Sequence, residues 1–347
     1  MNTKRWTVDK FVDDLHSYPQ IAQAANLLIN NEVVAFPTET VYGLGGNAEN
    51  DEAVAKIFAA KGRPSDNPLI IHIGEERQLH AFVEEIPDQA KQLMKEFWPG
   101  PLTLIFKKKE GKLSDQATAG LSTIAVRMPD HPVALAILKS SGLPIAAPSA
   151  NRSGKPSPTT ADHVFEDLNG KIAGIVDGGP TGVGVESTVL DCTEPVPVIL
   201  RPGAVTKELL ESVIGKVEID AALLDADQAP KSPGMKYQHY APDAPLHLVD
   251  GSKEVIQKLV DKKKEEGLSV GVLTTEENKP FYQADYVFAC GQRADLESVA
   301  SHLYDALRTF NNTNVDIIFS EMFPYEGVGT AIMNRLMKAA GHRVIIG

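Results

Sequence analysis

The sequence has little cysteine and no long hydrophobic segment. Its two cysteines, Cys192 and Cys290, lie far apart in the chain, which argues against a disulfide scaffold and a cysteine-rich zinc site. We expect both thiols to be buried, in different domains. Every apolar run is shorter than the roughly 18 residues of a membrane span, and the first residues lack the apolar core of a secretory signal. We therefore expect a cytoplasmic protein that does not contact a membrane.

Metal-binding and P-loop motifs are also missing. The nine histidines do not occur at metal spacing, and the sequence has no HExxH, CxxC or EF-hand loop. We expect no metal site made by protein groups alone. If a nucleotide binds, its phosphates can carry Mg²⁺ largely with water. The absence of a Walker lysine loop excludes a P-loop enzyme.

The overall composition is that of an ordinary globular protein, with 43% hydrophobic and 23% charged residues. A chain of 347 residues exceeds the usual size of one hydrophobic core, so we expect two domains. The net charge of −12 disfavours nonspecific adhesion to nucleic acid but leaves a local basic cleft possible.

The first domain, residues 1–215, is predicted to be mixed α/β. Strand-like and helical patterns alternate without a regular βα repeat, which favours a mixed sheet over a doubly wound one. Asp51 and Thr206 are plausible helix N-caps. The predicted strands are 33–36, 69–73, 102–106, 124–126, 144–147, 174–176, 188–190 and 198–200, and the predicted helices are 20–30, 51–60, 88–97, 131–140, 160–168 and 206–214.

The next segment, residues 216–245, is predicted to be an interdomain linker that also serves as a lid, because Tyr237 and Tyr240 could cover a bound nucleotide. The alternative is that these tyrosines only pack one domain against the other. Beyond the linker, residues 246–347 alternate strand and helix regularly, which predicts a smaller three-layer α/β domain. Its predicted strands are 246–249, 270–273, 286–289 and 315–319, and its predicted helices are 253–266, 296–310 and 330–340.

Polar and glycine-rich loops follow almost every strand of the first domain, which is where ligands bind in open α/β sheets. The segment 37–48 contains Gly43-x-Gly45-x-x-Ala48, the spacing of a dinucleotide fingerprint. We reject that reading because the strand ends too early to feed the turn. A tight loop facing a ligand, with Thr38 and Thr40 offering hydroxyls, fits better.

Cations occur in several of these loops. Lys61 and Arg63 flank a glycine in a proline-stiffened loop and could neutralise a triphosphate or a departing pyrophosphate. The alternative is a solvated helix end whose cations favour the helix dipole. Arg127 and Arg201 each end a predicted strand, where surface ion pairing is the simpler reading of either one alone. Together they suggest a cleft for an anion-rich substrate.

A third loop, 144–158, is rich in serine, asparagine and cations. Ser149 lacks the glycines of a nucleophile elbow, so covalent serine catalysis is improbable. Ser149 and Asn151 are natural hydrogen-bonding ligands for phosphate or ribose, although a plain hydrophilic loop is the alternative. The glycine-rich loop 178–188 delivers Ser187 at the start of a strand.

Taken together, these motifs resemble one family. The motifs Pro-Thr-Glu-Thr-Val-Tyr-Gly-Leu from residue 37, Lys-Gly-Arg-Pro from 61, Ser-Ala-Asn from 149 and Ser-Pro-Gly-Met-Lys-Tyr-x-His-Tyr from 232 are similar to the two-domain form of the L-threonylcarbamoyladenylate synthases, which are YrdC-like. The resemblance implies a twisted mixed sheet with a large positive cleft and a Rossmann-like C-terminal domain.

The resemblance also implies an activity and site residues. L-threonine, bicarbonate and ATP would give threonylcarbamoyl-AMP and pyrophosphate, for the modification of adenosine 37 in tRNA by a downstream transferase machinery. Lys61 and Arg63 would be the catalytic cations. Threonine contacts would be Thr38, His72, Arg127, Ala147 and Ser187, and ATP contacts would be Lys61, Arg63, Ser65, Thr123, Ser149, Asn151, Ser157, Arg201, Tyr237 and Tyr240.

This chemistry agrees with the residue types, since a reactive carbamate and a mixed anhydride need positioning, charge neutralisation and little water. It calls for little side-chain acid or base. One alternative is a non-catalytic module for double-stranded RNA or tRNA, which would explain the cations but not the hydroxyls and glycine loops. A second is a carbamoyl transferase that uses preformed carbamoyl phosphate.

Overall fold

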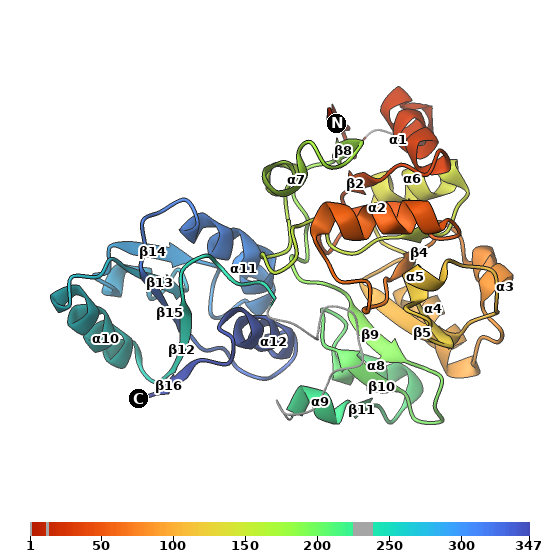
Figure 1. The fold of residues 1–347 in the computed structure, drawn as a ribbon. Helices are drawn as coiled ribbons and strands as arrows, with labels where there is room; N and C mark the ends of the chain where they lie inside the picture. Colours follow the sequence, from red (N-terminus) through yellow and green to blue (C-terminus); the bar gives the residue numbers. More distant parts are fainter. Residues whose placement is uncertain (1, 12–13, 225–238) are drawn as a thin grey trace. The chain divides into compact units, whose positions relative to one another are not determined.

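The computed structural model describes residues 2–11, 14–224 and 239–347. The chain divides into two compact units (Figure 1). Two short loops of the N-terminal region belong to the second unit. The first unit comprises residues 1–153, 158–182 and 186–236, and the second comprises 154–157, 183–185 and 237–347.

The first unit is built on an 11-stranded mixed sheet with the strand order β1-β8-β2-β3-β7-β4-β6-β5-β9-β10-β11. The prediction of a mixed sheet is therefore confirmed. The strands are β1 (Lys4–Thr7), β2 (Val34–Phe36), β3 (Gly43–Asn47), β4 (Ile71–His72), β5 (Leu102–Lys107), β6 (Thr123–Arg127), β7 (Ile145–Ala146), β8 (Gly174–Asp177), β9 (Thr188–Asp191), β10 (Val198–Arg201) and β11 (Glu218–Ile219).

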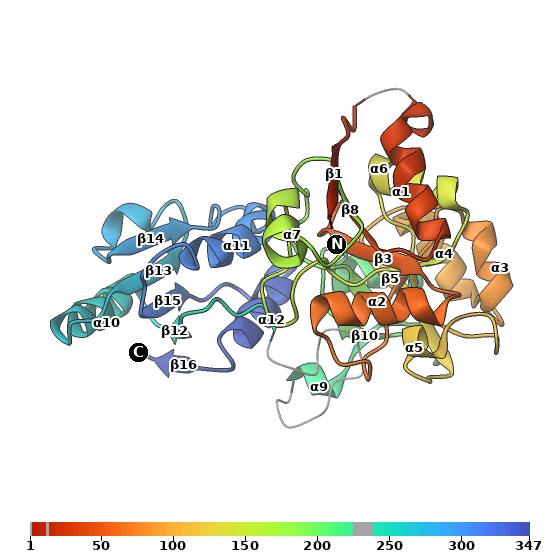
Figure 2. The same cartoon turned by 45° about the horizontal axis from the view of Figure 1, so that its top comes forward.

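Helices cover both faces of this sheet, because its central strands are apolar on both sides. In β2, Val34 and Phe36 pack in one core with α1 and α6, which lie side by side (Figure 2), whereas Ala35 packs in the other core with Ile57 of α2. The helical segments are η1 (Leu15–Ser17), α1 (Pro19–Ile29), α2 (Asp51–Lys61), η2 (Glu76–Gln78), α3 (Leu79–Phe82), α4 (Asp88–Phe97), α5 (Asp115–Thr118), α6 (Pro132–Ser141), α7 (Ala161–Leu168), α8 (Lys207–Ile214) and α9 (Ala221–Leu224).

Strand β3 was not predicted, because the sequence pattern indicated a loop over all of residues 37–48. The loop is shorter, because Gly43–Asn47 pairs with β2 and β7 in antiparallel fashion. Glycine is uncommon in strands, so the glycines of this segment gave no sign of β structure. A Cβ atom on Gly45 would lie 2.6 Å from the Phe36 ring, so the close approach of β2 requires glycine there. The rejection of a dinucleotide fingerprint agrees with this, since Gly43 and Gly45 lie in a strand and not in a turn.

The ends of α2 position the first cationic loop. Asn50, one residue before the predicted N-cap Asp51, caps this helix by accepting a hydrogen bond from the amide of Ala53 at 2.9 Å. Gly62 ends it in the left-handed region at φ 62°, a conformation that favours glycine. The helix therefore ends at Lys61. The other predicted cap, Thr206, is confirmed, since its hydroxyl accepts from the amide of Leu209.

Part of the predicted linker is folded. In the segment 216–245, β11 pairs in parallel with β10 and is followed by α9, and both belong to the first unit. Short strands of two residues carry too little pattern to be recognised in a sequence. Residues 225–238, which include Tyr237, lie outside the described residues.

The second unit contains a five-stranded, all-parallel sheet with the order β14-β13-β15-β12-β16. Val272 of β13 packs with Ile256 of α10, whereas Gly271 approaches the ring of Phe310 of α11, so helices cover both faces and the three-layer prediction is confirmed. The elements are β12 (Leu246–Asp250), α10 (Lys253–Glu265), β13 (Val270–Thr274), η3 (Lys279–Phe281), β14 (Tyr286–Ala289), α11 (Leu296–Phe310), β15 (Ile317–Glu321), α12 (Gly329–Ala339) and β16 (Val344–Ile346).

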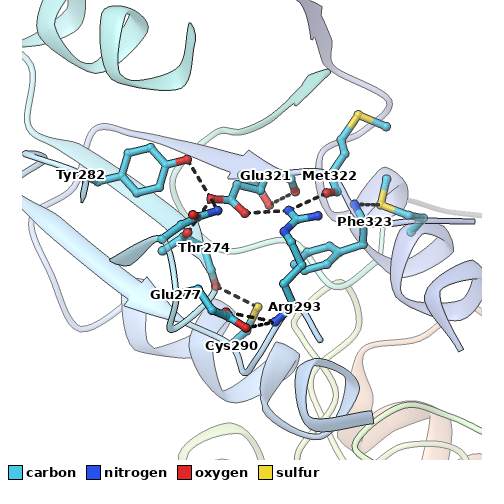
Figure 3. A network of polar contacts seen from close by, with 11 residues as sticks. Thr274, Glu277, Tyr282, Cys290, Arg293, Glu321, Met322 and Phe323 are labelled. Atoms are coloured by element: carbon cyan, nitrogen blue, oxygen red, sulfur yellow. Dashed lines mark hydrogen bonds and ion pairs between the residues drawn. The ribbon is translucent and has the colours of Figure 1, made fainter. Parts of the chain in front are cut away.

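One buried carboxylate organises the strand ends of this second sheet. Glu321 accepts hydrogen bonds from the Thr274 hydroxyl at 2.6 Å, the Asn278 amide at 3.0 Å and the Tyr282 hydroxyl at 2.8 Å. Its other oxygen pairs with Arg293 at 2.7 Å (Figure 3). The loops that follow β13 and β14 are thus fixed to the end of β15. Among the described residues, no helix is both long and apolar enough to cross a membrane.

Candidate active site

The sheet of the first unit gathers the residues expected to contact threonine. His72 and Arg127 are direct neighbours in the register of the parallel strands β4 and β6. The amide of Ala147 donates to the carbonyl of Ile70, just before β4. The five residues occupy strand ends or the adjoining loops: Thr38 after β2, His72 in β4, Arg127 at the end of β6, Ala147 after β7 and Ser187 before β9.

Arg127 is only 4% exposed and holds a charge that burial makes costly without partners. Its Nη1 donates to the Thr40 hydroxyl at 2.8 Å, and its Nε donates to the carbonyl of Gly100 at 3.3 Å. Its Nη2 forms an ion pair with Glu39. The loop after β2 and the end of β6 therefore meet at this guanidinium.

The loop after β2 is shaped by threonine hydroxyls. Thr38 Oγ1 accepts from the amides of Thr40 and Val41, at 3.2 and 3.3 Å, and donates to the carbonyl of Val41 at 2.7 Å. It also lies 2.9 Å from the Thr40 hydroxyl. Such local side-chain bonds replace a regular ladder in turns. They orient Thr40 toward Arg127, so the expected ligand-facing hydroxyls are part of one polar network.

His72 contributes a neutral imidazole to this network. Its Nδ1 lies 3.2 Å from the carbonyl of Ile70, and the ring is buried. Burial, and secondarily the positive charges of Arg127 and Arg201, lower the pKa of His72 to about 3. The ring is therefore uncharged at neutral pH, and it lies within electrostatic range of both arginines.

Ser187 and Arg201 form the next part of the site. Arg201 donates from Nε to the Ser187 carbonyl and from Nη2 to the Ser187 hydroxyl, both at 3.1 Å. The same hydroxyl lies 2.7 Å from the hydroxyl of Thr103 in β5. Arg201 was expected to contact ATP and Ser187 to contact threonine. In the structure these two residues are hydrogen-bonded to each other, so the expected threonine contacts and the expected ATP contacts adjoin at this point.

Lys61 connects the second set of expected residues. Its ammonium donates to the carbonyl of Ser149, to the carbonyl of Asn151 at 2.7 Å and to the Asn151 side-chain oxygen at 3.3 Å. The Ser149 hydroxyl donates to the Asn151 side chain at 2.6 Å. Gly43 of β3 bridges to Ser149, which fixes this turn to the sheet. The structure thus brings Lys61, Ser149 and Asn151 together.

The remainder of the Lys61 loop is more exposed. Arg63 donates from Nη2 to the carbonyls of Asn67 and Pro68, at 3.4 and 3.3 Å, which curls the loop around its guanidinium. Ser65 lies on the surface of this loop. Lys61 and Arg63 therefore differ in setting, because Lys61 is buried at the end of α2 whereas Arg63 is partly open to solvent.

Thr123 lies at the opposite end of β6 from Arg127, about 13 Å away at the rise of an extended strand. It lines a separate cavity of about 790 Å³, together with Lys107, Thr193 and Glu194. Unlike the residues above, Thr123 is not gathered with Lys61 or Arg127. Its expected contact with ATP stays a prediction.

Two other expected ATP contacts belong to the second unit. Ser157 is fully buried at the end of the loop 154–157, next to Pro156, whose carbonyl accepts two hydrogen bonds from Arg308 of α11. Tyr240 is buried with its ring 5.2 Å from that of Tyr304. Both rings belong to the second unit, so this stacking does not test packing of one domain against the other, and a contact of Tyr240 with nucleotide stays a prediction. Tyr237 lies outside the described residues.

Sequence reasoning did not include Glu39 or Thr103 among the site residues. Glu39 lies between Thr38 and Thr40 in a loop at a strand end, and this position is the sequence feature that could have indicated a site residue. Thr103 sits inside an apolar strand, and only the pairing of β5 with β9 brings it to Ser187. Among the residues described, no group of three or more His, Cys, Asp or Glu could hold a metal ion. Cys192 and Cys290 are buried in different units, as expected, and burial raises the pKa of each thiol to about 12.

Two models of known protein families match this chain. A family model described as telomere recombination, with the name Sua5_yciO_yrdC, matches residues 26–203. A second model, described as the C-terminal domain of threonylcarbamoyl-AMP synthase, matches residues 205–341. The two matches follow one another along the chain, in the order of the two structural units.

Relatives match over almost the whole chain. The threonylcarbamoyl-AMP synthase of Bacillus subtilis is 63% identical over 99% of this chain and 100% of its own length. That of Pyrococcus abyssi is 51% identical over 94% of this chain and 95% of its own length. The crystal structure of P. abyssi Sua5 complexed with L-threonine matches with a TM-score of 0.89 at 47% identity, covering 100% of this chain and 99% of that one. The chain therefore belongs to the threonylcarbamoyl-AMP synthase family, an enzyme family of the nucleotidyltransferase type.

Proposed function

We propose that this enzyme makes threonylcarbamoyl-AMP from L-threonine, bicarbonate and ATP, with release of pyrophosphate. One observation carries the proposal: three cations, Lys61, Arg127 and Arg201, are each at most 5% exposed yet lie at helix or strand ends beside loops rich in hydroxyls. Buried cations need anionic or strongly polar partners. A triphosphate and two carboxylates, those of threonine and bicarbonate, are such partners.

In this proposal the Arg127 network binds the amino acid. A guanidinium fits a carboxylate through parallel N–H donors, so Arg127 takes the threonine carboxylate. Thr38, Ala147 and Ser187 surround the remainder of the substrate. His72, uncharged at neutral pH, can bind a neutral or anionic group without adding positive charge. The P. abyssi structure that contains L-threonine supports this choice of substrate.

The Lys61 network binds the nucleotide in this proposal. Lys61 and Arg63 neutralise charge on the β and γ phosphates as the bond to the α phosphorus breaks. Ser149, Asn151 and Arg201 hold the adenylate. The remaining expected ATP contacts, Ser65, Thr123 and Ser157, stay predictions, and Thr123 lies at the end of β6 away from Arg127. Mg²⁺ would be carried by ATP, bound by phosphate oxygens and water, and would neutralise phosphate charge. The described site residues fit that arrangement, because no group of three or more His, Cys, Asp or Glu among them is placed to hold the ion without ATP.

The reaction sequence follows from the chemistry. The threonine amine adds to bicarbonate, and a carbamate oxygen then attacks the α phosphorus. The carbamate and the mixed anhydride both hydrolyse readily, so a site of buried side chains protects them. The product then serves the machinery that modifies adenosine 37 of tRNA in the cytoplasm. The reaction itself does not require tRNA to bind this enzyme.

Two other functions remain to be tested against this one. An RNA-binding module would also use the cations, and its binding would fall steeply with salt in the absence of ATP turnover. A carbamoyl transferase would replace bicarbonate by carbamoyl phosphate. The burial of three cations, Lys61, Arg127 and Arg201, favours a small-molecule site over a nucleic-acid surface. Cations that bind a nucleic-acid backbone are usually exposed to solvent.

The decisive experiment measures pyrophosphate release with each component omitted. We expect release from the complete mixture of ATP, L-threonine and bicarbonate, and background release when either threonine or bicarbonate is left out. Equal release without threonine would refute the assignment. Release supported by carbamoyl phosphate in place of bicarbonate would identify the carbamoyl transferase.

A further inference from the structure

Glu39 is held in the first unit by a single polar contact of its side chain. Its side chain is 13% exposed and forms an ion pair with Arg127. Neither carboxylate oxygen has a further hydrogen-bond partner among the described residues. A largely buried carboxylate ordinarily accepts several hydrogen bonds, so this one is unusually poor in donors. Among the described residues, Arg127 is the group that neutralises its charge.

Binding of an amino acid changes this pair. All three nitrogens of Arg127 are already engaged, by Gly100, Thr40 and Glu39. A substrate carboxylate can reach the guanidinium most readily by replacing Glu39, because that exchange substitutes one carboxylate for another. The ammonium group of an α-amino acid is attached next to its carboxylate. It therefore arrives beside the carboxylate that has just been displaced.

The reaction needs a base at this place. Near neutral pH the amino group of threonine is protonated, and an ammonium nitrogen has no lone pair with which to attack bicarbonate. We propose that Glu39 receives the ammonium group of the substrate and removes its proton before the carbamate forms. The inference rests on the proposed function and adds to it a general base that the residue pattern did not indicate.

The step balances as follows. The ammonium N–H bond breaks and its proton passes to a Glu39 carboxylate oxygen, which leaves the amine with its electron pair. The amine then forms a C–N bond to the carbon of bicarbonate, whose C–OH bond breaks, and the departing hydroxide takes a proton from nitrogen and leaves as one molecule of water. Glu39 later returns its proton to solvent. No oxidant, reductant or metal ion takes part.

The titratable groups near Glu39 include an arginine, an aspartate and a histidine. Arg127 is its ion-pair partner, and Asp130 and His131, in the connection between β6 and α6, lie within electrostatic range of it. Burial, and secondarily the charge of Glu39, raise the pKa of Asp130. Burial, with the charge of Lys10, lowers the pKa of His131 to about 4, so that its ring is neutral during turnover. Asp130 is an acid close to Glu39 and supplies the matched control.

The experiment compares Glu39→Gln with the unaltered enzyme in the pyrophosphate assay from pH 6.5 to 9.5, with ATP and bicarbonate saturating. The amide keeps the size of the side chain and removes its basicity. We expect kcat/KM for threonine to fall about 10²- to 10⁴-fold at pH 7. The loss should shrink as the pH rises, because threonine then supplies its own free amine. Asp130→Asn should change the rate only a few-fold, equally at every pH.

Several results would overturn the inference. A loss in Glu39→Gln that is the same at every pH means a structural role, and an unchanged rate means no role. Tighter threonine binding with normal turnover, measured by calorimetry, means that Glu39 only occupies Arg127. If Glu39→Gln does not fold, Glu39→Ala decides: restored turnover on adding formate supports the base, and no restoration opposes it. A wild-type enzyme that releases pyrophosphate without threonine or bicarbonate would refute the function itself, which separates the two failures.

Discussion

An ion pair between an arginine and a glutamate of low exposure occurs in both units, Arg127–Glu39 in the first and Arg293–Glu321 in the second, and the two glutamates are satisfied differently. In the second unit, Glu321 pairs with Arg293 and also accepts from three neutral donors. In the first unit, Glu39 pairs with Arg127 and accepts from no other described group. Both glutamates lie close to strand ends, where ligands of α/β sheets usually bind.

The difference shows which strand end is built for a ligand. Four contacts saturate Glu321, so its carboxylate cannot take a new partner without breaking the fold of its neighbours. Glu39 has unused acceptor capacity, and its partner Arg127 can exchange one carboxylate for another. A buried polar group with missing partners is costly, and proteins keep such groups mainly where function uses them. We therefore expect stability effects in the second unit and activity effects in the first.

The largest expected effect is on stability, from Glu321→Gln. Removing the carboxylate charge weakens the hydrogen bonds to buried Glu321, whereas Arg293 is 40% exposed and keeps its bond to the Met322 carbonyl, so we expect a loss of about 1.5–3 kcal/mol. Thermal unfolding should show a lower midpoint, whereas turnover per folded molecule should stay unchanged. Glu266→Gln is the control, because its pair with Lys263 on α10 is exposed to solvent. Lost turnover in folded Glu321→Gln would contradict the division of roles.

The next effect is on turnover, from Lys61→Ala. Removing a preorganised charge that stabilises the transition state should lower kcat about 10²-fold or more. The assay is pyrophosphate release, corrected for the folded fraction. Lys56→Ala is the matched control, because Lys56 lies on the same helix and pairs with Glu32 at the surface. If Lys61→Ala changes only stability, then Lys61 is a structural cation.

A smaller effect, confined to one substrate, is expected from Arg127→Lys. An ammonium cannot make the paired donor contacts of a guanidinium, and the loss of one charged hydrogen bond corresponds to about 1.5–3 kcal/mol. The KM for threonine should therefore rise roughly 10- to 100-fold, with the KM for ATP nearly constant. Equal changes in both KM values would mean that Arg127 acts on the whole fold and not on the amino acid.

The smallest effect is a pH dependence of stability. His131 is buried, neither ring nitrogen has a partner among the described residues, and burial lowers its pKa from 6.5 to about 4. Between these values the unfolded chain binds a proton that the folded chain does not. Stability should therefore fall as the pH falls, by up to about 1.4 kcal/mol per pH unit. His131→Leu should flatten this part of a urea-denaturation series. An unchanged slope would show that the ring becomes protonated in the folded chain.

Much of the candidate site could be predicted because it depends on local sequence. The loops around Lys61 and Ser149 are rich in glycine, proline and hydroxyl residues, which mark loops in a sequence. Ligands of open α/β sheets bind at strand ends, so the position of these loops was informative as well. Strand β3 could not be predicted in this way. Its run of glycines lacks the alternation of a strand, and the approach of the Phe36 ring to Gly45 exists only after β2 and β3 have paired.

The sequence by itself determined the two α/β regions, the family and the residue types of the site, because periodicity and motifs are local properties of the chain. The tertiary structure decided which of those residues meet. Register placed His72 beside Arg127, and pairing of β5 with β9 brought Thr103 to Ser187. Only the fold could show that Glu39 has a single partner, since the number of donors around a side chain depends on segments that are distant in sequence.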